Sequence, residues 1–515
     1  MRETQCQVLV VGDEIESILT AISASRAGAV TVLARRSTGP LGGLSVRGGL
    51  SYMDITPELL CGLFQEFLSR CGFIRVALNP DKAHAVLQAM LAEAKVRVIS
   101  GMTVQLTLNS AGFPEQALLT NPKGSSEVLK PEVLHPRVVI DASPDADVAR
   151  SLGLPFVEGL GGILGAEQNF LGVSPVFRIT GLSVEAFQAF EARLRQNPEL
   201  PQILAQALPY HPSDLRTEYL TRPTFAPPDQ DYLDILNPVI GIDYHLWRNK
   251  SAASYASADI FIDGGNVSRL SDGSLGFNGL VAQVKALNLD LEGLIALSQG
   301  GPTPAILQAE MRHFERYLRE QGPFPQVSVI PPSELYVRQT VNLLSRETLT
   351  ARRAIEGGVA PEKAIGTFSY WLDLRGTQLW QLYPNEHLPK PIFNVGLEVA
   401  LPATTAVQNF AFVSRSAGYS PIGQGTGRIV QHNALLGEGV GVAAALASLS
   451  GQSLLDTATQ RIADIQACLA HRQGGTLRIE GKATWSPAQI EANSLLKADK
   501  AIVDALRKSN FILKG

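Results

Sequence analysis

The segment Val8–Arg36 (VLVVGDEIESILTAISASRAGAVTVLARR) constrains the fold of this 515-residue chain more than any other stretch. An apolar run ends at Val11, as in a parallel strand that is covered on both faces. From Ile15 to Ile22 apolar residues recur at helical spacing, and Gly28 is placed to end that helix before a second strand, VTVLA. This order of strand, turn, helix and strand predicts an α/β fold with a Rossmann-like parallel sheet.

The turn between this strand and helix departs from the nucleotide-binding fingerprint G-x-G-x-x-G. In the fingerprint the first glycine permits the tight turn, the second lets the backbone approach a pyrophosphate, and the third lets helix and strand pack closely. Here these positions are Gly12, Glu14 and Ser17. A carboxylate about 4 Å from a phosphate charge costs roughly 4 kcal/mol at an effective dielectric constant near 20. We therefore expect the Glu14 side chain to point away from the phosphates, to be neutralised, or to take another role such as accepting ribose hydroxyls.

The end of the second strand also departs from the fingerprint. The acidic residue expected there is Ala34, and Arg35 and Arg36 follow it. These arginines could supply positive charge toward phosphate or adenine. Basic residues at this place also suit the 2′-phosphate of NADP, so an NADP-binding dehydrogenase is an alternative. Against that alternative stand Glu14, the interrupted fold described next, and the lack of a Tyr-x-x-x-Lys pair in a suitable helix.

The rest of the chain indicates that the nucleotide-type fold is interrupted and later resumed. Short alternating strands, a Pro-rich stretch at 197–231 and one long amphipathic helix, PAILQAEMRHFERYLREQG, are typical of an inserted α+β domain that closes over a substrate. Before it, alternating segments near 117–120 and 127–133 predict a small antiparallel hairpin in the first domain. We therefore expect four segments: the first part of the nucleotide domain (1–160), the inserted α+β domain (161–398), the C-terminal part of the nucleotide domain (399–460) and a helical tail (461–515).

Four distant segments, in the same order along the chain, resemble one known family. They are GPLGGLSVRGGLSYMD (39–54), VVIDASPDADVARSLGLPF (138–156), SELYVRQTVNLLSRETLT (333–350) and GRIVQHNALLGEGVGVAAALA (427–447). The family is that of the FAD-dependent oxidoreductases with a glutathione-reductase-like flavin domain, distant relatives of the fumarate-reductase flavoproteins. A C-terminal helix that returns to the first domain is typical of flavoproteins, whereas a nicotinamide-binding domain is usually one contiguous block.

The resemblance implies FAD as the cofactor and indicates which residues would bind it. Gly42 and Gly43 match the paired glycines of a loop that runs under the pyrophosphate toward the flavin ring, while Ser143-Pro144 replaces a Thr-Gly pair of the family. A helix beginning near Gly437 is expected to present free N–H groups and its positive dipole end to the flavin or the pyrophosphate. The expected cofactor-binding residues are Gly12, Glu14, Ser17, Arg35, Gly42, Gly43, Val104, Ala142, Asp145, Gly437, Glu438 and Gly441.

The same resemblance implies hydride transfer between a small organic substrate and the flavin, which is the chemistry this cofactor supplies. Arg338 corresponds to an arginine of the family's substrate domain and could bind a substrate carboxylate with two hydrogen bonds, or else pair with Glu334. His245, in IDYHLW, suits proton transfer near neutral pH, or else is a structural histidine. Arg47 lies in the loop expected near the ring and could stabilise an anionic reduced flavin. These three are the expected catalytic residues.

Composition and charge exclude several other classes. The net charge of −4 and the lack of a Lys/Arg block argue against nucleic-acid binding. The four cysteines follow no metal-ligand or Cys-x-x-Cys spacing, so we expect no metal site and no disulfide-reductase mechanism. The N-terminus, MRETQC, has no signal-peptide pattern, and the longest apolar run is short for a membrane span and carries Glu438. We expect a cytoplasmic protein that acts on a small molecule and is possibly a homo-oligomer.

A further alternative belongs to another functional class. Glu14, Ala34 and the Ser143-Pro144 exchange are compatible with a flavoprotein-like scaffold that has lost FAD and acts in interaction or regulation. Such a scaffold would be colourless, and FAD would leave its thermal stability unchanged. The NADP alternative instead predicts that NADP stabilises the protein and FAD does not.

Overall fold

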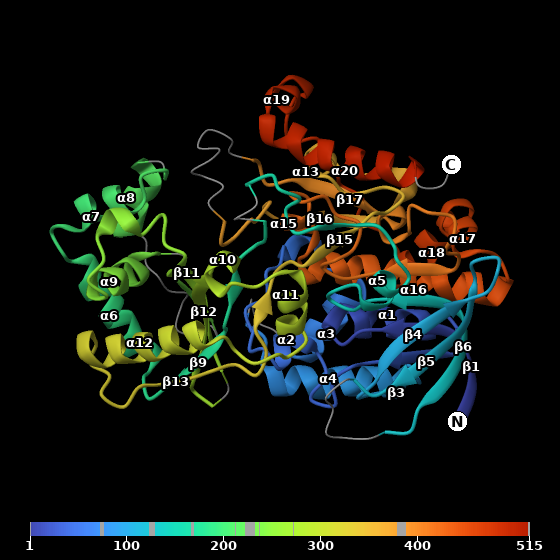
Figure 1. The fold of residues 1–515 in the computed structure, drawn as a ribbon, viewed down its shortest axis with the longest axis horizontal. Helices are drawn as coiled ribbons and strands as arrows, with labels where there is room; N and C mark the ends of the chain where they lie inside the picture. Colours follow the sequence, from blue (N-terminus) through green and yellow to red (C-terminus); the bar gives the residue numbers. More distant parts are fainter. Residues whose placement is uncertain are drawn as a thin grey trace.

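The computed structural model describes residues 2–72, 77–122, 129–165, 169–211, 213–221, 232–235, 237–270, 272–377 and 388–512. Its first sheet has a parallel half in the order β3-β2-β1-β6, and β18 pairs in parallel with the second half of β6. These strands are β1 (Arg2–Val11), β2 (Thr31–Ala34), β3 (Arg97–Ile99), β6 (Glu132–Asp141) and β18 (Phe410–Phe412). A strand near residue 410 therefore completes a sheet that begins at residue 2 (Figure 1). The expected discontinuous, Rossmann-like α/β fold is confirmed.

The register of this sheet brings four chain segments together at one edge. Val11 pairs with Ala34 and with Asp141, and Asp141 pairs with Phe412, so the carboxyl ends of β1, β2, β6 and β18 are level. The loops that follow these strands therefore meet, as ligand-binding loops do in open parallel sheets. All the expected phosphate-binding positions in the first domain follow one of these strand ends.

An antiparallel hairpin extends the sheet on the other side. β5 (Pro114–Thr120) pairs with β4 (Thr103–Leu108) and with the first half of β6. The hairpin expected near 117–120 and 127–133 is thus confirmed, although residues 123–128 of its turn lie outside the described part of the chain.

Helices on this domain enclose one large apolar core. α1 (Ile15–Arg26) packs against both β1 and α16 (Val430–Ser450). By length and mean hydropathy (1.3) α16 could cross a membrane, yet 83% of its apolar window is buried in the protein, as in the core helix of a globular domain. The other helices near this sheet are α2 (Gly43–Val46), α3 (Gly62–Arg70), α4 (Pro80–Glu93), α5 (Asp147–Ser151), α17 (Leu454–Gln460) and α18 (Ile462–Arg472).

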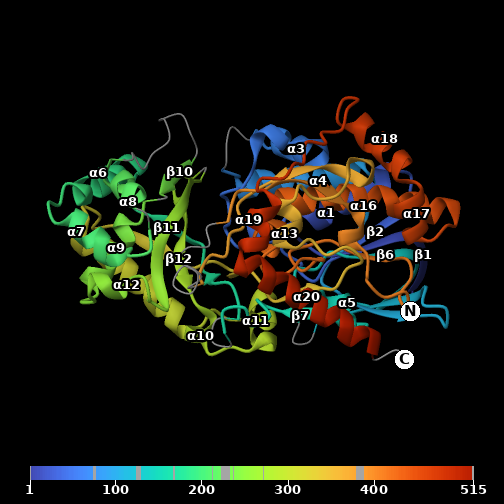
Figure 2. The same cartoon turned by 90° about the horizontal axis from the view of Figure 1, so that it is seen from above.

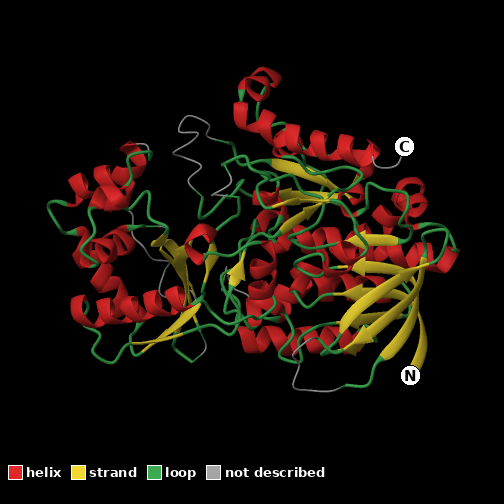
Figure 3. Cartoon of the chain, in the orientation of Figure 1, coloured by secondary structure: helices red, strands yellow, loops and turns green. Residues whose placement is uncertain are grey.

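A second lobe lies beside the parallel sheet and contains an antiparallel sheet (Figures 1–3). Its strands are β8 (Val173–Ser174), β9 (Phe177–Thr180), β10 (Tyr232–Ile235), β11 (Ile260–Arg269), β12 (Leu275–Ala282), β13 (Ser328–Ile330) and β14 (Tyr336–Val337). Its helices are α6 (Val184–Arg195), α7 (Leu200–Ala207), α8 (Ser213–Thr221), α9 (Val239–Trp247), α10 (Val284–Leu287), α11 (Leu291–Ser298) and α12 (Ala305–Gln321). An α+β lobe with an antiparallel sheet is what the sequence predicts for the insertion, and the elements of this lobe occupy the part of the expected range 161–398 that ends at Val337.

Much of the described chain between β14 and α16, together with β7 and the C-terminal tail, covers the top of the molecule in Figure 1. Two small antiparallel pairs form there, β7 (Phe156–Glu158) with β15 (Val341–Leu343) and β16 (Ala364–Ser369) with β17 (Ile392–Gly396). α13 (Ala351–Ile355), α15 (Gln424–Gly427), α19 (Pro487–Ala492) and α20 (Ser494–Ile512) complete this region. Buried Asp499 of α20 accepts hydrogen bonds from the backbone amides of Ala351 and Ile422, so the tail packs on the body. The boundaries at 160, 398 and 460 stay predictions.

Candidate cofactor and substrate site

The turn after β1 is closed against the end of β6. Gly12 has a φ of +154°, and a Cβ at this position would clash with the carbonyl of Ala142 and the hydroxyl of Ser17. The Ser17 hydroxyl donates to that same carbonyl at 2.8 Å. Gly12, Ser17 and Ala142 therefore join two strand ends by close packing, which is the structural role that the fingerprint assigns to its first and third positions.

The second fingerprint position is filled by a side chain that turns toward the paired-glycine loop. The Glu14 carboxylate accepts a hydrogen bond from the backbone amide of Leu44 at 2.9 Å. Gly43 has a φ of +51°, and a Cβ there would collide with the same carboxylate. Gly42, with a φ of +105°, forms an isolated parallel bridge with Glu14. The glycine loop thus has the expected open backbone, but the Glu14 carboxylate lies in its concave side.

Two acidic side chains crowd this position. Burial, and then the neighbouring Glu16, raise the pKa of Glu14 well above the usual range. Burial also raises the pKa of Glu16, one of whose carboxylate oxygens has no hydrogen-bond partner among the described residues. Arg415 faces both carboxyls and lowers both pKa values, although less than burial raises them.

Arg35, expected near the phosphates, and Arg47, expected near the flavin ring, are both held by carboxylates of the chain itself. Asp13 lies 2.6 Å from Arg35 Nε and 2.8 Å from Arg47 Nη2. Arg35 also donates to the carbonyls of residues 39 and 40, and Arg47 pairs at 2.5 Å with Glu334 at the border of the second lobe. The sequence had suggested Glu334 as a partner for Arg338, and that suggestion is wrong.

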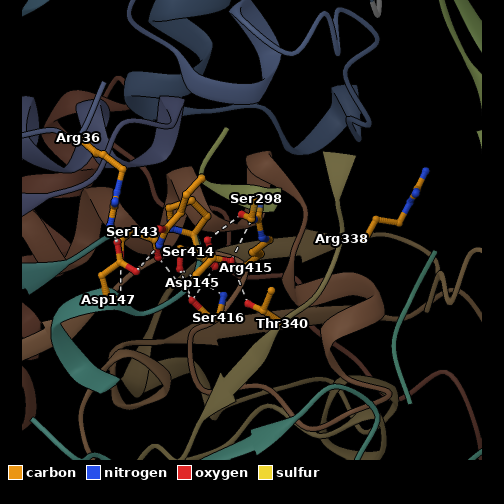
Figure 4. Close-up of polar contacts among 12 residues, drawn as sticks. Arg36, Ser143, Asp145, Asp147, Ser298, Arg338, Thr340, Ser414, Arg415 and Ser416 are labelled. Carbon is orange, nitrogen blue, oxygen red and sulfur yellow. Dashed lines mark hydrogen bonds and ion pairs between the residues drawn. The ribbon is translucent and has the colours of Figure 1, made fainter. Parts of the chain in front are cut away.

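Asp145 is the centre of a buried polar cluster and is also fully engaged (Figure 4). Its carboxylate accepts from Ser298 at 2.7 Å and from Thr340 at 2.9 Å, and it lies 3.3 Å from Arg415 Nη2. The side chain is 1% exposed. These contacts come from α11, from the segment before β15 and from the loop after β18. Asp145 therefore connects the second lobe to the carboxyl edge of the parallel sheet.

The turn that contains Ser143-Pro144 closes on itself. Asp141 accepts from the Ser143 hydroxyl at 2.6 Å and from the backbone amides of Val148 and Ala149 at 2.9 and 2.8 Å. Asp147 pairs with Arg36 at 3.3 Å (Figure 4). The Asp141 carboxylate is therefore bonded within the turn and the start of α5, and the Asp147 carboxylate is paired with Arg36 from the loop after β2.

The predicted role of the glycines in α16 is not what the structure shows. The helix begins at Val430, not near Gly437, so Gly437 and Gly441 lie well inside it. A Cβ on Gly437 would clash with Thr20, and one on Gly441 would lie 2.7 Å from the Cβ of Ser23, both on α1. The small residues let two helices approach closely, and they present no free N–H groups to a ligand.

Glu438 also has a structural contact. Its carboxylate accepts from the backbone amide of Leu63 at 2.9 Å and lies 3.6 Å from Arg472. It therefore anchors α3 to α16.

Val104 is half-buried in β4, where it pairs with Leu119. Neither Val104 nor Glu438 contacts the loop of Glu14 among the interactions of the described residues.

Arg338 lies in a different place from the Asp145 cluster and points away from it (Figure 4). Its Nη1 donates to the carbonyl of Gly172 at 2.7 Å and to the hydroxyl of Ser174 at 2.9 Å, and its guanidinium lies 4.3 Å from the centre of the Tyr336 ring. The residue is 1% exposed, and burial lowers its pKa to about 10. Its Nη2 has no hydrogen-bond partner within the described ranges.

Further charged residues surround Arg338 and were not expected from the sequence. Arg428 donates to the Tyr336 hydroxyl at 2.5 Å and pairs with Asp373 at 2.5 Å, while Arg375 pairs with Asp263 at 3.0 Å. We call Tyr336, Arg338, Asp373, Arg375 and Arg428 the junction cluster, because they come from both lobes. Gly427-Arg428 opens the last of the four family-like segments, and this was the one available signal.

The contacts of His245 are with residues outside the junction cluster. It lies on α9, where its Nε2 is 2.8 Å from the Ser254 hydroxyl and its ring packs on Tyr255. Burial lowers its pKa to about 4, so the imidazole is neutral near pH 7. These contacts fit the structural histidine that the sequence left as the alternative, and a catalytic role for His245 stays a prediction.

An open cavity of about 610 Å³ lies beside Arg35. It is bounded by the loop after β2, by one face of α4 and by the edge strand β3. The lining residues are Arg35, Thr38, Gly39, Pro40, Leu41, His84, Gln88, Leu91, Ala92, Val96, Val98 and Ser100. It has room for a small molecule and lies next to the loop that carries Gly42.

Comparison with solved structures finds weak similarity over nearly the whole chain. A geranylgeranyl bacteriochlorophyll reductase-like protein from Thermoplasma acidophilum is 11% identical, with 97% of this chain and 100% of that chain covered and a TM-score of 0.41. The p-nitrophenol 4-monooxygenase of Pseudomonas putida is 11% identical (100% and 98% covered, TM-score 0.37). A 3-ketosteroid dehydrogenase of Rhodococcus jostii is 12% identical (86% and 98% covered, TM-score 0.33). These scores are too low to say anything of the reaction.

Comparison with protein families is more informative. No curated protein matches the chain. One family model, described as FAD dependent oxidoreductase, matches residues 7–469. Because that match includes both parts of the parallel sheet and the whole inserted lobe, the chain belongs to the family of FAD-dependent oxidoreductases.

Proposed function

We propose that this protein transfers hydride between a small organic acid and FAD, with the acid bound at the junction of the two lobes. The family implies FAD, and the flavin ring would accept or donate the hydride. The observation that supports an acid as substrate is the Arg338 guanidinium, which is buried and leaves Nη2 without a partner in the described part of the chain. A buried cation with a free donor is costly unless an anion completes it.

The neighbours of Arg338 favour a carboxylate over a neutral substrate. Its other donor is fixed by Gly172 and Ser174, so the guanidinium plane is set before a ligand arrives. Arg428 lies close enough to lower the pKa of Arg338, and it is itself neutralised by Asp373. A substrate carboxylate would therefore add the charge that Arg338 lacks, through a charge-assisted hydrogen bond.

The residues present fit FAD unevenly. The cavity beside Arg35 gives space next to the adenosine end, and the buried Gln424 Oε1 and Thr426 Oγ1, just before α16, lack partners among the described residues. The pyrophosphate position does not fit, because the Glu14 carboxylate occupies the Leu44 amide.

A second candidate function is that of a flavoprotein-like scaffold that has lost FAD binding and acts in interaction or regulation. The Glu14 contact with Leu44 is the specific observation that favours it. The NADP alternative has less support, because Arg35 and Arg36 are paired with Asp13 and Asp147. A cytoplasmic location and homo-oligomer formation remain predictions.

The acid-binding proposal is tested by thermal unfolding with a panel of small mono- and dicarboxylates. We expect at least one acid to raise the Tm of the wild type and to have no effect on Arg338→Met. Ser174→Ala, which removes one partner of Arg338 but keeps its charge, serves as the matched control and should still respond. If no acid stabilises the wild type, or if Arg338→Met responds equally, the proposal is wrong.

A further inference from the structure

The Glu14 side chain has the chemistry and the placement of an internal phosphate substitute. A carboxylate, like a phosphate, presents anionic oxygens that accept hydrogen bonds from backbone amides. Here the acceptor lies 2.9 Å from the Leu44 amide and against the Cα of Gly43, where no side chain could fit. The glycine loop is therefore shaped around a carboxyl group, and that group belongs to the chain.

The surrounding charges leave little room for a second anion. Asp13 and Glu14 lie on the turn after β1, and Glu16 lies in the first turn of α1. The two arginines nearest to Asp13, Arg35 and Arg47, are already paired with it. The Leu44 amide already donates to the Glu14 carboxyl group, which also fills the space at Gly43, so a phosphate cannot take the same position. Where Glu14 is ionised, a phosphate about 4 Å away would also be repelled by roughly 4 kcal/mol.

We infer that Glu14 and FAD exclude each other: FAD binds only when the Glu14 carboxylate leaves the Leu44 amide, and the side chain acts as an internal competitor of the cofactor. This inference rests on FAD being the cofactor, as the proposed function also does. It goes beyond that function because it assigns to one residue of this chain the control of whether the cofactor site is open.

The neighbouring contacts indicate how the closed form is maintained. Arg47 connects Asp13 to Glu334, and the Ser333 hydroxyl donates to the Arg47 carbonyl at 2.6 Å, so the glycine loop is fixed to the border of the second lobe. Arg415, which faces Glu14 and Glu16, is held by Asp145. The closed site is thus part of the lobe junction. Asp13 contacts the glycine loop through the Arg47 side chain, whereas Glu14 accepts from a backbone amide of that loop.

Equilibrium titration with FAD, followed by the change in flavin fluorescence, tests the inference on the full chain. Glu14→Gly restores the second glycine of the fingerprint and should bind FAD at least about tenfold more tightly than the wild type. Glu14→Gln, which keeps the volume but removes the charge, should fall between them at pH 9, above the raised pKa of about 8 of Glu14. Glu480→Gly, which removes an exposed loop carboxylate, should match the wild type.

The outcomes separate this inference from the proposed function. Equal FAD affinity of the wild type and Glu14→Gly would overturn the inference and leave the proposed function intact. Binding by neither protein would overturn both, whereas binding by Glu14→Gly alone would support the inference and show that the wild type does not use FAD under those conditions. If Glu14→Gly fails to fold, as judged by circular dichroism, Glu14→Gln decides the question, since it should still bind more tightly than the wild type.

Discussion

Asp145 and Arg415 form a buried ion pair, with 3.3 Å between Oδ1 and Nη2, that joins the loop after β6 to the loop after β18. The two residues are 270 positions apart in the chain, and their contact holds the resumed part of the parallel sheet to its first part. Ser298 donates to Asp145 and accepts from Arg415, so the inserted lobe enters the same cluster.

The first prediction concerns this ion pair. Arg415→Met should lower the free energy of unfolding by about 3 kcal/mol, because it leaves the buried Asp145 carboxylate without its cation. Urea unfolding of the two proteins measures the difference. Arg178→Met removes an arginine from an exposed ion pair with Asp272 and should cost less than about 1 kcal/mol. Equal losses for the two variants would show that Asp145 does not need Arg415.

The second prediction concerns pH. Burial raises the pKa of Glu14 and of Glu16, so the folded state binds more protons than the unfolded state above the unfolded pKa. Stability should therefore fall as pH rises from about 5 toward 9, and it should be highest on the acidic side of this range. Among the other charged groups that face Glu14, Arg415 and Arg47 lower its pKa and Glu334 raises it, and burial outweighs the two arginines.

Urea unfolding at pH 6 and pH 9 measures this dependence. The double variant Glu14→Gln/Glu16→Gln should lose less stability over the interval than the wild type. A remaining decrease is expected in both proteins, because burial raises the pKa of Asp141 and of Asp499 to about 6. A double variant with the same pH dependence as the wild type would mean that the two glutamates are ionised in the folded protein.

The third prediction concerns the contact of α1 with α16. Gly441→Ala should destabilise the protein by about 1–3 kcal/mol, because the new methyl group would lie within 2.7 Å of the Cβ of Ser23. Ser450→Ala, at the exposed end of the same helix, should change stability by less than about 0.5 kcal/mol. Thermal unfolding compares them. A neutral Gly441→Ala would show that the two helices can separate without cost.

The fourth prediction concerns the connection between the lobes. Arg47 and Glu334 are 2.5 Å apart and mostly buried, so a double-mutant cycle with Arg47→Ala and Glu334→Ala should give a coupling energy of about 0.5–3 kcal/mol. If the two substitutions change the free energy of unfolding additively, the Arg47–Glu334 pair makes no net contribution to stability.

The parallel sheet could be predicted from the sequence because its strands are continuous apolar runs with a turn and a periodic helix between them. β1, α1 and β2 fall where the pattern of Val8–Arg36 puts them. The antiparallel lobe and the hairpin of β5 and β6 were equally accessible from alternating residues. Local sequence patterns predict well whether a segment forms a helix or a strand.

The site was less accessible, because its contacts join residues far apart in the chain. The order of motifs along a sequence cannot show that Glu14 reaches Leu44 or that Asp145 is surrounded by Ser298, Thr340 and Arg415. The glycines of α16 were read as a ligand-binding helix start, yet small residues inside a helix equally serve close packing. Periodicity does not distinguish these roles, and only the neighbouring helix decides.

The most direct test of the account is an experimental structure of the wild-type protein at saturating FAD. The account predicts that an FAD phosphate accepts the hydrogen bond of the Leu44 amide and that the Glu14 side chain has turned away from Gly43. FAD bound across the glycine loop while Glu14 keeps its contact with Leu44 would contradict it.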